Sequence, residues 1–470
     1  MTTTVAVGSV SVSTSGTLTG QLLETFASAL SVSSATTVTA ITTAGTTGAP
    51  ITLPASPSTG SNSLIIPTSD TGVISVPSGY QFVVYQGTGS LVGGDSSTVI
   101  IGDLNYAGGA GTVIGTGTQS GTVVDTTPGA TFAMATGSEL VFGLASAQSF
   151  RFDSGYSTLV SAGSGQSVSV DSSASVIGFY TGTANFMQTG GAETMYAGPG
   201  VSTVDATAGN TVFFGSNAGD MVSLGSGTGE VLDTNETGAG AGMTTVMAGT
   251  GSDTIFAQGG VDYTGSTGKS LFIGGPGHST VYTAANETAY GGTGGEVVSI
   301  AAGSKLLFLG GGGADTLMGG TVAPTVWGNV GENLTVADSV SGGLYVMYGS
   351  NDQMNLTSTG GAAHIVAIDG GPFAGNATLT MSNAGGDALV LFSPAEFGLT
   401  AVTHTLTVAN WQASDLLDLT FTTISGQEFG YSQANATAAQ TALASGSSFT
   451  LSDGTTVVFQ GAKPTTVAHI

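Results

Sequence analysis

The chain has 470 residues, of which 78 are glycine and none is cysteine, and its 29 acidic residues face only four basic ones, for a formal net charge of −25. Four basic residues cannot neutralise a phosphate backbone or hold an anionic lipid surface, so the composition argues against a nucleic-acid partner and against direct binding to an anionic membrane. Direct membrane insertion is not expected, because no apolar run is long enough to span a membrane. The acidic excess favours cations as partners, because bound cations relieve repulsion among carboxylates. The alternative is that most of these charges only keep a glycine-rich chain soluble.

Short apolar runs between glycines predict the fold class. Hydrophobic residues make up 40% of the chain, and their runs recur every 8 to 12 residues, whereas convincing helical periodicity is nearly absent. Short β-branched and aromatic runs separated by glycine-rich turns are typical of many short strands. We therefore expect an all-β chain that forms a parallel β-solenoid, with apolar side chains facing inward and serine and threonine facing outward.

Residues 1–63 are predicted to form an N-terminal assembly or capping segment. Gly20–Ser31 is the best helix candidate, because its larger apolar residues fall on one face. This helix would either cover the open end of a solenoid or act as an anchor or assembly helix. The proline-containing stretch 43–63 then reads as a linker. An N-terminal signal peptide is not expected, because the sequence begins without a basic and apolar leader.

Residues 64–385 are predicted to form the solenoid, and their strongest repeat is Gly310–Met318. It follows the pattern G-G-x-G-x-D-x-U-x, in which U is a large apolar residue. Its glycines permit a tight turn, Asp315 supplies a carboxylate, and Leu317 begins an inward-pointing strand. Weaker copies keep the second and fourth glycines and carry Asp, Glu or Ser at the sixth position: Ala248–Phe256, Gly274–Tyr282, Gly291–Ser299, Ala197–Asp205 and Ala162–Val170.

The spacing of these copies predicts the length of a turn. The copies that start at 274, 291 and 310 lie 17 and 19 residues apart, and the other intervals of 35 and 51 residues are close to multiples of that length. The interval of 26 residues between the starts at 248 and 274 does not fit and indicates an insertion or a half-turn. We expect about 17–19 residues per turn.

Residues 386–470 are predicted to form a C-terminal β cap. Glycine becomes sparser there, and Phe449–Gly461 reads as a hairpin whose turn is Asp453-Gly454.

These features resemble RTX-type (repeats-in-toxin) calcium-binding β-roll proteins, a group that includes bacterial S-layer and other surface proteins. The resemblance rests on the nonapeptide Gly310–Met318, its variant Ala248–Phe256, the acidic composition without cysteine, and the terminal hairpin. It covers about residues 160–320 at the level of motifs. It implies a β-roll that binds calcium outside the cell, and export through a type I secretion channel that reads the C-terminus.

On this resemblance, the acidic residues at the sixth position are the candidate calcium ligands: Asp315, Asp253 and Glu296. Ser279, Ser202 and Ser167 occupy the same position in other copies and supply no charge, so we expect a few separate sites in place of a continuous row of ions. The alternative for each carboxylate is a turn residue that accepts a hydrogen bond from nearby backbone.

No arrangement of side chains in the sequence indicates catalysis. The four histidines are scattered without ligand spacing, and no glycine-rich turn continues into a phosphate-binding lysine motif. We expect a structural protein and not an enzyme. It would self-assemble through its N- and C-terminal ends into a calcium-stabilised filament or S-layer-like array on the bacterial surface or in a biofilm matrix.

The alternative function is a polysaccharide-active enzyme or a carbohydrate-binding adhesin on the same scaffold, with cell-surface polysaccharide as the partner. Solenoids present long faces to glycans. Five tyrosines would either form a strip on which sugars stack or occupy solenoid corners: Tyr80, Tyr85, Tyr106, Tyr156 and Tyr180.

Overall fold

The computed structural model describes most of the chain after residue 136, in the ranges 136–215, 219–233, 243–329, 331–337, 340–348, 352–368, 376–392, 403–422 and 428–468. Before residue 136 it describes the stretches 3–7, 10–14, 37–40, 62–66, 73–77, 79–80, 82–85, 90–93, 99–102, 113–115, 121–125 and 128–134. Two compact units make up the chain, Met1–Gly229 (unit 1) and Glu230–Ile470 (unit 2). The predicted helix Gly20–Ser31 lies outside the described residues.

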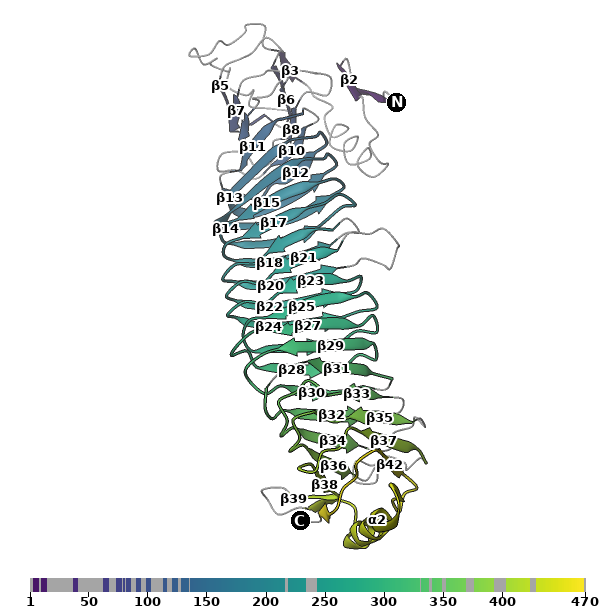
Figure 1. Cartoon of the computed structure of the whole chain (residues 1–470). Coiled ribbons are helices and arrows are strands. Elements are labelled where there is room, and N and C mark those ends of the chain that lie inside the picture. Colours follow the sequence, from purple (N-terminus) through teal and green to yellow (C-terminus); the bar gives the residue numbers. More distant parts are fainter. Residues whose placement is uncertain are drawn as a thin grey trace. The chain divides into compact units, whose positions relative to one another are not determined.

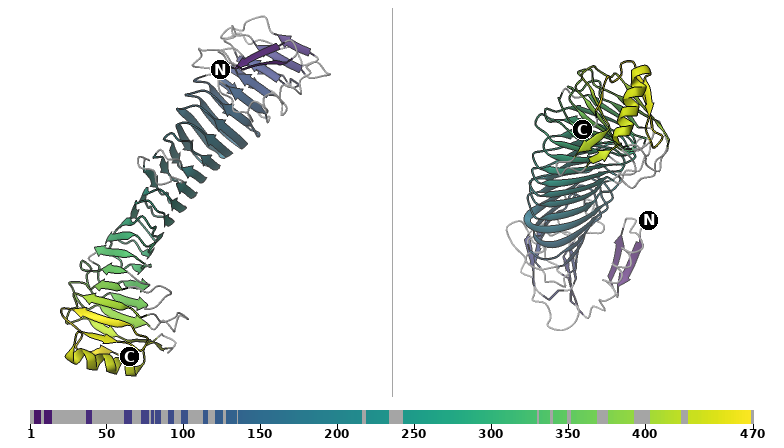
Figure 2. Two further views of the ribbon diagram at one scale, coloured as in Figure 1. Left: turned by 90° about the vertical axis from the view of Figure 1, so that its right-hand side faces the viewer. Right: turned by 90° about the horizontal axis from the view of Figure 1, so that it is seen from below.

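The fold is a mostly-β parallel β-solenoid, as predicted. Each turn of the solenoid supplies two strands, and most described strands pair in parallel with the strand one turn before and the strand one turn after. Two ladders result within each unit, here named the odd ladder and the even ladder after the strand numbers that dominate them (Figures 1 and 2). Parallel stacking of this kind joins the backbone amides of neighbouring turns.

In unit 1 the odd ladder contains β5 (Val73–Val76), β7 (Ser90–Gly93), β9 (Val113–Gly115), β11 (Thr131–Met134), β15 (Ala184–Gln188), β17 (Thr203–Ala206) and β19 (Met221–Ser223). The even ladder contains β3 (Thr37–Ala40), β4 (Asn62–Ile66), β6 (Phe82–Tyr85), β8 (Val99–Gly102), β10 (Thr122–Asp125), β12 (Leu140–Gly143), β16 (Ala192–Tyr196) and β18 (Asn210–Gly215). The long strands β13 (Ser149–Ser161) and β14 (Gln166–Tyr180) take part in both ladders. β1 (Thr3–Val7) and β2 (Val10–Thr14) form a separate antiparallel pair, and β20 (Thr228–Asp233) contains the boundary between the units.

In unit 2 the odd ladder contains β21 (Thr244–Met247), β23 (Val261–Thr264), β25 (Ser279–Thr283), β27 (Glu296–Ile300), β29 (Ala314–Gly319), β31 (Asn333–Ala337), β33 (Gln353–Asn355), β35 (Ala377–Thr380), β37 (Thr405–Ala409) and β42 (Thr456–Gln460). The even ladder contains β22 (Ser252–Ala257), β24 (Lys269–Gly274), β26 (Glu287–Tyr290), β28 (Leu306–Leu309), β30 (Thr325–Trp327), β32 (Leu344–Tyr348), β34 (His364–Ile368), β36 (Ala388–Phe392), β38 (Leu416–Asp418) and β43 (Val467–Ala468).

The strand registers confirm the predicted turn length around the nonapeptides. Ser279 pairs with Glu296, an offset of 17 residues, and Val297 pairs with Thr316, an offset of 19. The interval of 26 residues between the copies at 248 and 274 is one and a half turns, because the first copy leads into β22 of the even ladder and the second into β25 of the odd ladder. Of the two explanations offered from the sequence, the half-turn is correct.

Inward-facing apolar side chains form the core of each turn. In the odd ladder of unit 2, Val281, Val298, Leu317 and Val336 lie in register on successive strands, and each is at most 1% exposed. Burial of one such side chain stabilises the fold by about 1.5–3 kcal/mol. Leu317 therefore points inward, as its place in the nonapeptide predicts.

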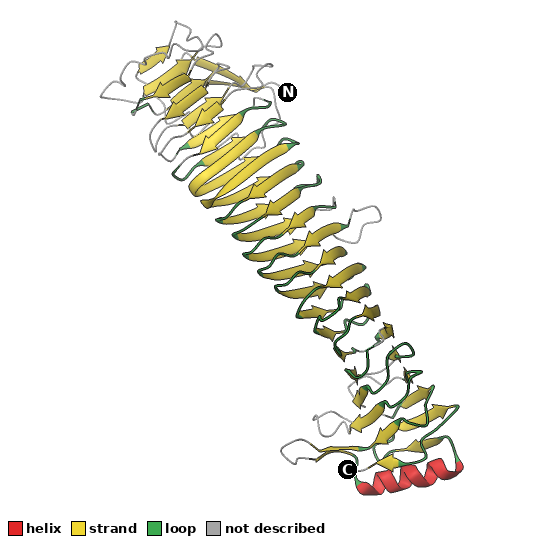
Figure 3. Ribbon diagram, turned by 60° about the vertical axis from the view of Figure 1, so that its left-hand side comes forward, coloured by secondary structure: helices red, strands yellow, loops and turns green. Residues whose placement is uncertain are grey.

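The C-terminal hairpin is confirmed, and a helix beside it was not predicted. β41 (Ser448–Thr450) pairs antiparallel with β42 across the Asp453-Gly454 turn, and β39 (Thr420–Thr422) pairs with β40 (Glu428–Gly430). The helix α2 (Gln433–Ser445) packs against β41 and β43 (Figure 3). Alanines and one leucine form its buried face, so it lacks the large apolar periodicity that marks most amphipathic helices.

Within the described residues, no helix is sufficiently long and apolar to span a membrane. The parallel ladders of unit 2 run past residue 386 into β36, β37 and β38. The division into segments 1–63, 64–385 and 386–470 stays a prediction, since continuous pairing does not by itself define where one folding unit ends.

Candidate functional site: a column of buried carboxyl groups

In two of the nonapeptides the acidic sixth residue closes its own turn. The backbone N–H of Gly292 donates to Glu296 Oε2 at 2.9 Å, and the N–H of Gly249 donates to Asp253 Oδ2 at 3.0 Å. In both turns the donor is the second residue of the repeat and the acceptor the sixth. The carboxyl group thus takes up a backbone donor that the tight turn leaves without a partner.

Three carboxyl groups follow one another on consecutive turns of the odd ladder in unit 2. Glu296 begins β27, Asp315 lies in β29, and Glu332 precedes β31; we call them the carboxylate column. The backbone N–H of Glu296 donates to Asp315 Oδ1 at 2.6 Å, and that of Gly312 donates to Glu332 Oε2 at 3.0 Å. All three side chains are about 1% exposed.

Glycine at the first position of the repeat makes room for this column. A Cβ built on Gly291 would lie 3.0 Å from Asp315 Oδ2, and one on Gly310 would collide with the carboxyl group of Glu332. A Cβ on Gly274 would likewise collide with Glu296. In these three nonapeptides the first glycine therefore admits the carboxyl group of the following turn, which explains a part of the motif that turn geometry alone does not.

One oxygen of each carboxyl group in the column has no hydrogen-bond partner among the described residues: Glu296 Oε1, Asp315 Oδ2 and Glu332 Oε1. Burial, together with the neighbouring Asp315, raises the pKa of Glu296 to about 8 and the pKa of Glu332 to about 9. Like charges this close cannot all ionise without a counter-charge. The column must therefore hold either protons or a cation.

A hard cation fits this chemistry. Calcium binds oxygen ligands, and carboxylate and backbone carbonyl oxygens are the usual ones. No three His, Cys, Asp or Glu side chains of the described ranges converge on one metal position. A calcium ion would therefore use carboxylates of neighbouring turns, Glu296 with Asp315 or Asp315 with Glu332, and complete its shell with backbone carbonyls and water. When bound, it would neutralise the paired charges and join successive turns.

The structure brings together two of the three ligands predicted from the sequence. Glu296 and Asp315 are neighbours in the column, whereas Asp253 lies in the even ladder, in register with Ser270 and, one turn further, Glu287. Asp253 is buried at 2% exposure and accepts the Gly249 hydrogen bond of its own turn. Its calcium role stays a prediction, and it would concern a site separate from the column.

Glu332 was missed in the sequence because its repeat is degenerate. The segment 328–336 reads GNVGENLTV, which lacks the second glycine and carries its acidic residue at the fifth position. Register places Leu334 opposite Asp315, so Glu332 joins the column from two residues before the position directly opposite Asp315. A search for an acidic residue directly after a G-x-x-G turn would have found it.

The tyrosine strip predicted for the alternative function is wrong. Tyr80, Tyr85 and Tyr180 are buried in the core, at most 5% exposed, while Tyr156 is 76% exposed. Tyr106 lies outside the described residues. Because three of the five rings face inward, they cannot form a surface on which sugars stack.

A different set of aromatic side chains lies on the outer face of unit 1. Phe179, Tyr196 and Phe214 are in register on β14, β16 and β18 of the even ladder. Their rings stack at 4.8 and 4.5 Å between centroids, with interplanar angles of 5° and 3°. Phe179 is 41% exposed and Tyr196 is 38% exposed. We call this stack the aromatic ridge.

Comparison of the chain with protein-family models, with curated proteins and with solved structures gives no match. The likeness to RTX-type proteins therefore rests on the nonapeptides and on the β-solenoid fold.

Proposed function

We propose that this protein is an extracellular structural β-solenoid that assembles side by side with further copies of itself into a calcium-stabilised filament or S-layer-like array. The observation that carries the proposal is the aromatic ridge. Stacked rings of Phe179 and Tyr196 form an exposed apolar strip on the parallel even ladder, and such strips in soluble proteins mark interaction surfaces.

A second copy of the chain is the partner that best suits this ridge. Strands in a parallel ladder repeat every 4.7–4.9 Å, so two copies laid along one another can match ring to ring over several turns. The ridge consists of Phe179, Tyr196 and Phe214, one from each of β14, β16 and β18, and none of them is charged. Contacts between ridges would avoid the repulsion expected between two chains that each carry a formal charge of −25.

Assembly through the chain ends, as predicted from the sequence, has less support than assembly through the aromatic ridge. At the C-terminal end of unit 2, α2 packs against β41 and β43. The outermost strand β41 is only three residues long. Short and covered edge strands are typical of ends that do not propagate a sheet.

Calcium has a supporting role in the proposal. The carboxylate column would take up the ion and remove charge from successive turns of unit 2, so the solenoid stiffens where the ion binds. RTX-type kinship, an extracellular location and type I secretion belong to the same proposal. They are supported by the nonapeptide Gly310–Met318 and the terminal hairpin.

Electron microscopy of the purified chain, with calcium and with excess chelator, tests this function. We expect ordered polymers in calcium and fewer or shorter ones in chelator. If the polymers form equally well in chelator, the structural role stands and calcium has no part in assembly. Dispersed monomers in both conditions, confirmed by sedimentation at high protein concentration, would refute the assembly.

A further inference from the structure

The basic side chains of this chain divide into two kinds. Arg151 forms an ion pair with Asp153 at 2.6 Å, and Lys463 Nζ donates to the carbonyls of Leu443 and Gly446, where α2 ends. Lys269 and Lys305 are exposed and form no ion pair with a described residue. In a chain with a formal charge of −25, two exposed lysines in one row without an ion-pair partner among the described residues are unexpected.

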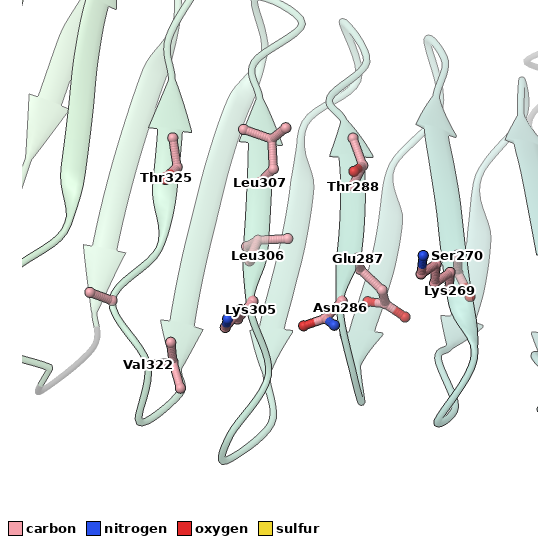
Figure 4. A pocket seen from close by; sticks show the side chains of 11 residues that line it. Lys269, Ser270, Asn286, Glu287, Thr288, Lys305, Leu306, Leu307, Val322 and Thr325 are labelled. Atoms are coloured by element: carbon pink, nitrogen blue, oxygen red, sulfur yellow. The ribbon is translucent and has the colours of Figure 1, made fainter.

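Both lysines belong to one row on the outer face of the even ladder in unit 2. Ser270 pairs with Glu287 and Glu287 with Leu306, so the preceding residues Lys269, Asn286 and Lys305 follow one another in the same order (Figure 4). We call them the lysine row. Two strand spacings separate the lysines, about 10 Å along the ladder. One small anion cannot contact both.

A second row lies two residues further along each strand. Register joins alternating hydroxyl and apolar side chains on β22, β24, β26, β28 and β30: Thr254, Leu271, Thr288, Leu307 and Thr325. The strands with a lysine carry leucine in this row, and the strand with Asn286 carries threonine. The surface therefore repeats every second strand: a lysine and a leucine lie at β24 and again at β28, and an asparagine and a threonine lie at β26 between them.

These rows border an open pocket of about 490 Å³. Lys269, Asn286, Thr288, Lys305 and Leu307 line it, together with Glu287 (Figure 4). Glu287 is 5% exposed; its Oε1 accepts a hydrogen bond from the Tyr263 hydroxyl at 3.2 Å, and its Oε2 has no hydrogen-bond partner among the described residues. The Glu287 side chain thus faces the solenoid interior, and the outer face of the pocket offers two cations together with amide and hydroxyl groups.

We propose that this face binds a linear acidic polysaccharide, laid along the ladder, whose anionic group occurs on every second sugar. Each lysine would donate a charge-assisted hydrogen bond to one anionic group of the glycan. Asn286 and Thr288 would bond sugar hydroxyls, and the leucines would contact the apolar faces of the rings. An alternating glycan matches the two-strand repeat, whereas a uniformly charged polymer would place an anion opposite the neutral Asn286 strand.

The test uses the full chain and short hyaluronan oligosaccharides, an alternating uronate polymer, followed by fluorescence anisotropy with and without chelator. We expect binding that weakens with salt. Lys269→Gln and Lys305→Gln should each weaken it roughly 10-fold, as loss of a charge-assisted hydrogen bond does. Arg151→Gln removes the same charge in unit 1 and should leave the affinity unchanged.

Three outcomes would overturn the site: equal affinity for carboxyl-reduced hyaluronan, equal affinity for free glucuronate, or tighter binding of duplex DNA of similar length. Binding that chelator abolishes and the lysine variants do not affect would also overturn it, because calcium would then be the bridge. The site is independent of assembly. The Lys269→Gln/Lys305→Gln double variant should still form polymers in calcium, so failure of either proposal can be recognised separately.

Discussion

The backbone N–H of Glu296 donates to the carboxyl group of Asp315 one turn later, at 2.6 Å, and both side chains are about 1% exposed. This contact uses a buried acid as a connector between turns. It also leaves Glu296 Oε1 and Asp315 Oδ2 without hydrogen-bond partners among the described residues. The arrangement that holds the turns in register therefore leaves two buried carboxyl oxygens that a proton or a cation must neutralise.

Stability without calcium should fall as pH rises. Burial raises the folded-state pKa of Glu296 to about 8 and that of Glu332 to about 9, above the usual value for glutamic acid. Between the ordinary pKa and the raised one, the unfolded chain has lost a proton that the folded chain keeps, so the free energy of unfolding decreases with pH. Thermal unfolding in chelator, followed by circular dichroism, should give the highest Tm near pH 4–5 and a steady decline to about pH 9.

Calcium should reverse this trend, because it binds only the ionised carboxylates. The rise in Tm on adding calcium should be small at pH 5 and large at pH 8. A Tm in chelator that increases between pH 5 and pH 8 would contradict the protonated state of the column. A calcium effect of the same size at both pH values would place the ion elsewhere.

Glu332→Gln should abolish much of the calcium response. Glutamine keeps the size of the side chain and can donate to Asp315, but it does not ionise. We expect a flatter dependence of Tm on pH in chelator and a smaller rise in Tm with calcium. Glu230→Gln, at an exposed position, is the matched control and should leave both unchanged. An unaltered calcium response in Glu332→Gln would remove this residue from the site.

The sequence predicts the solenoid well because its core obeys a simple spacing. Val298 and Leu317 lie in register, 19 residues apart, as the nonapeptide starts require. Side chains whose role depends on the neighbouring turn are harder to predict, because register decides which residues meet. Asp253 and Asp315 occupy the same motif position, yet they lie in different ladders. Glu332 breaks the motif and nevertheless joins the column.

Helix α2 and the lysine row were missed for different reasons. The buried face of α2 consists of Ala436, Ala439 and Leu443, which periodicity of large apolar residues does not detect. Lys269 and Lys305 are 36 residues apart in sequence and become neighbours two strands apart only through the 17- and 19-residue offsets of their turns.

Gly310→Ala should destabilise the fold through the carboxylate column. Gly310 has no left-handed backbone conformation, so its substitution tests only the space that Glu332 occupies. We expect a loss of about 1–3 kcal/mol in the free energy of unfolding, as for overpacking of a well-filled interior. Denaturant unfolding measures it. Gly446→Ala, where the nearest atom lies 3.4 Å from the new Cβ, is the control.

In a Glu332→Ala background, Gly310→Ala should lower the free energy of unfolding much less than it does in the unaltered chain, because the colliding carboxyl group is absent. Equal losses in the presence and absence of the Glu332 side chain would show that another contact of Gly310 sets the cost.

Tyr196→Asp should impair assembly without unfolding the solenoid. Tyr196 is the middle ring of the aromatic ridge and is 38% exposed, so a charge there adds repulsion to the proposed contact and removes apolar area from it. Truncation of a central aromatic anchor commonly costs 2 kcal/mol or more, which corresponds to a rise of roughly 30-fold in the concentration needed for polymers. Sedimentation over a protein concentration series measures this threshold. Val201→Asp adds the same charge at a turn position that is 47% exposed and should shift the threshold little. If both variants raise it equally, net charge and not the ridge governs assembly, and the ridge must be assigned to another partner.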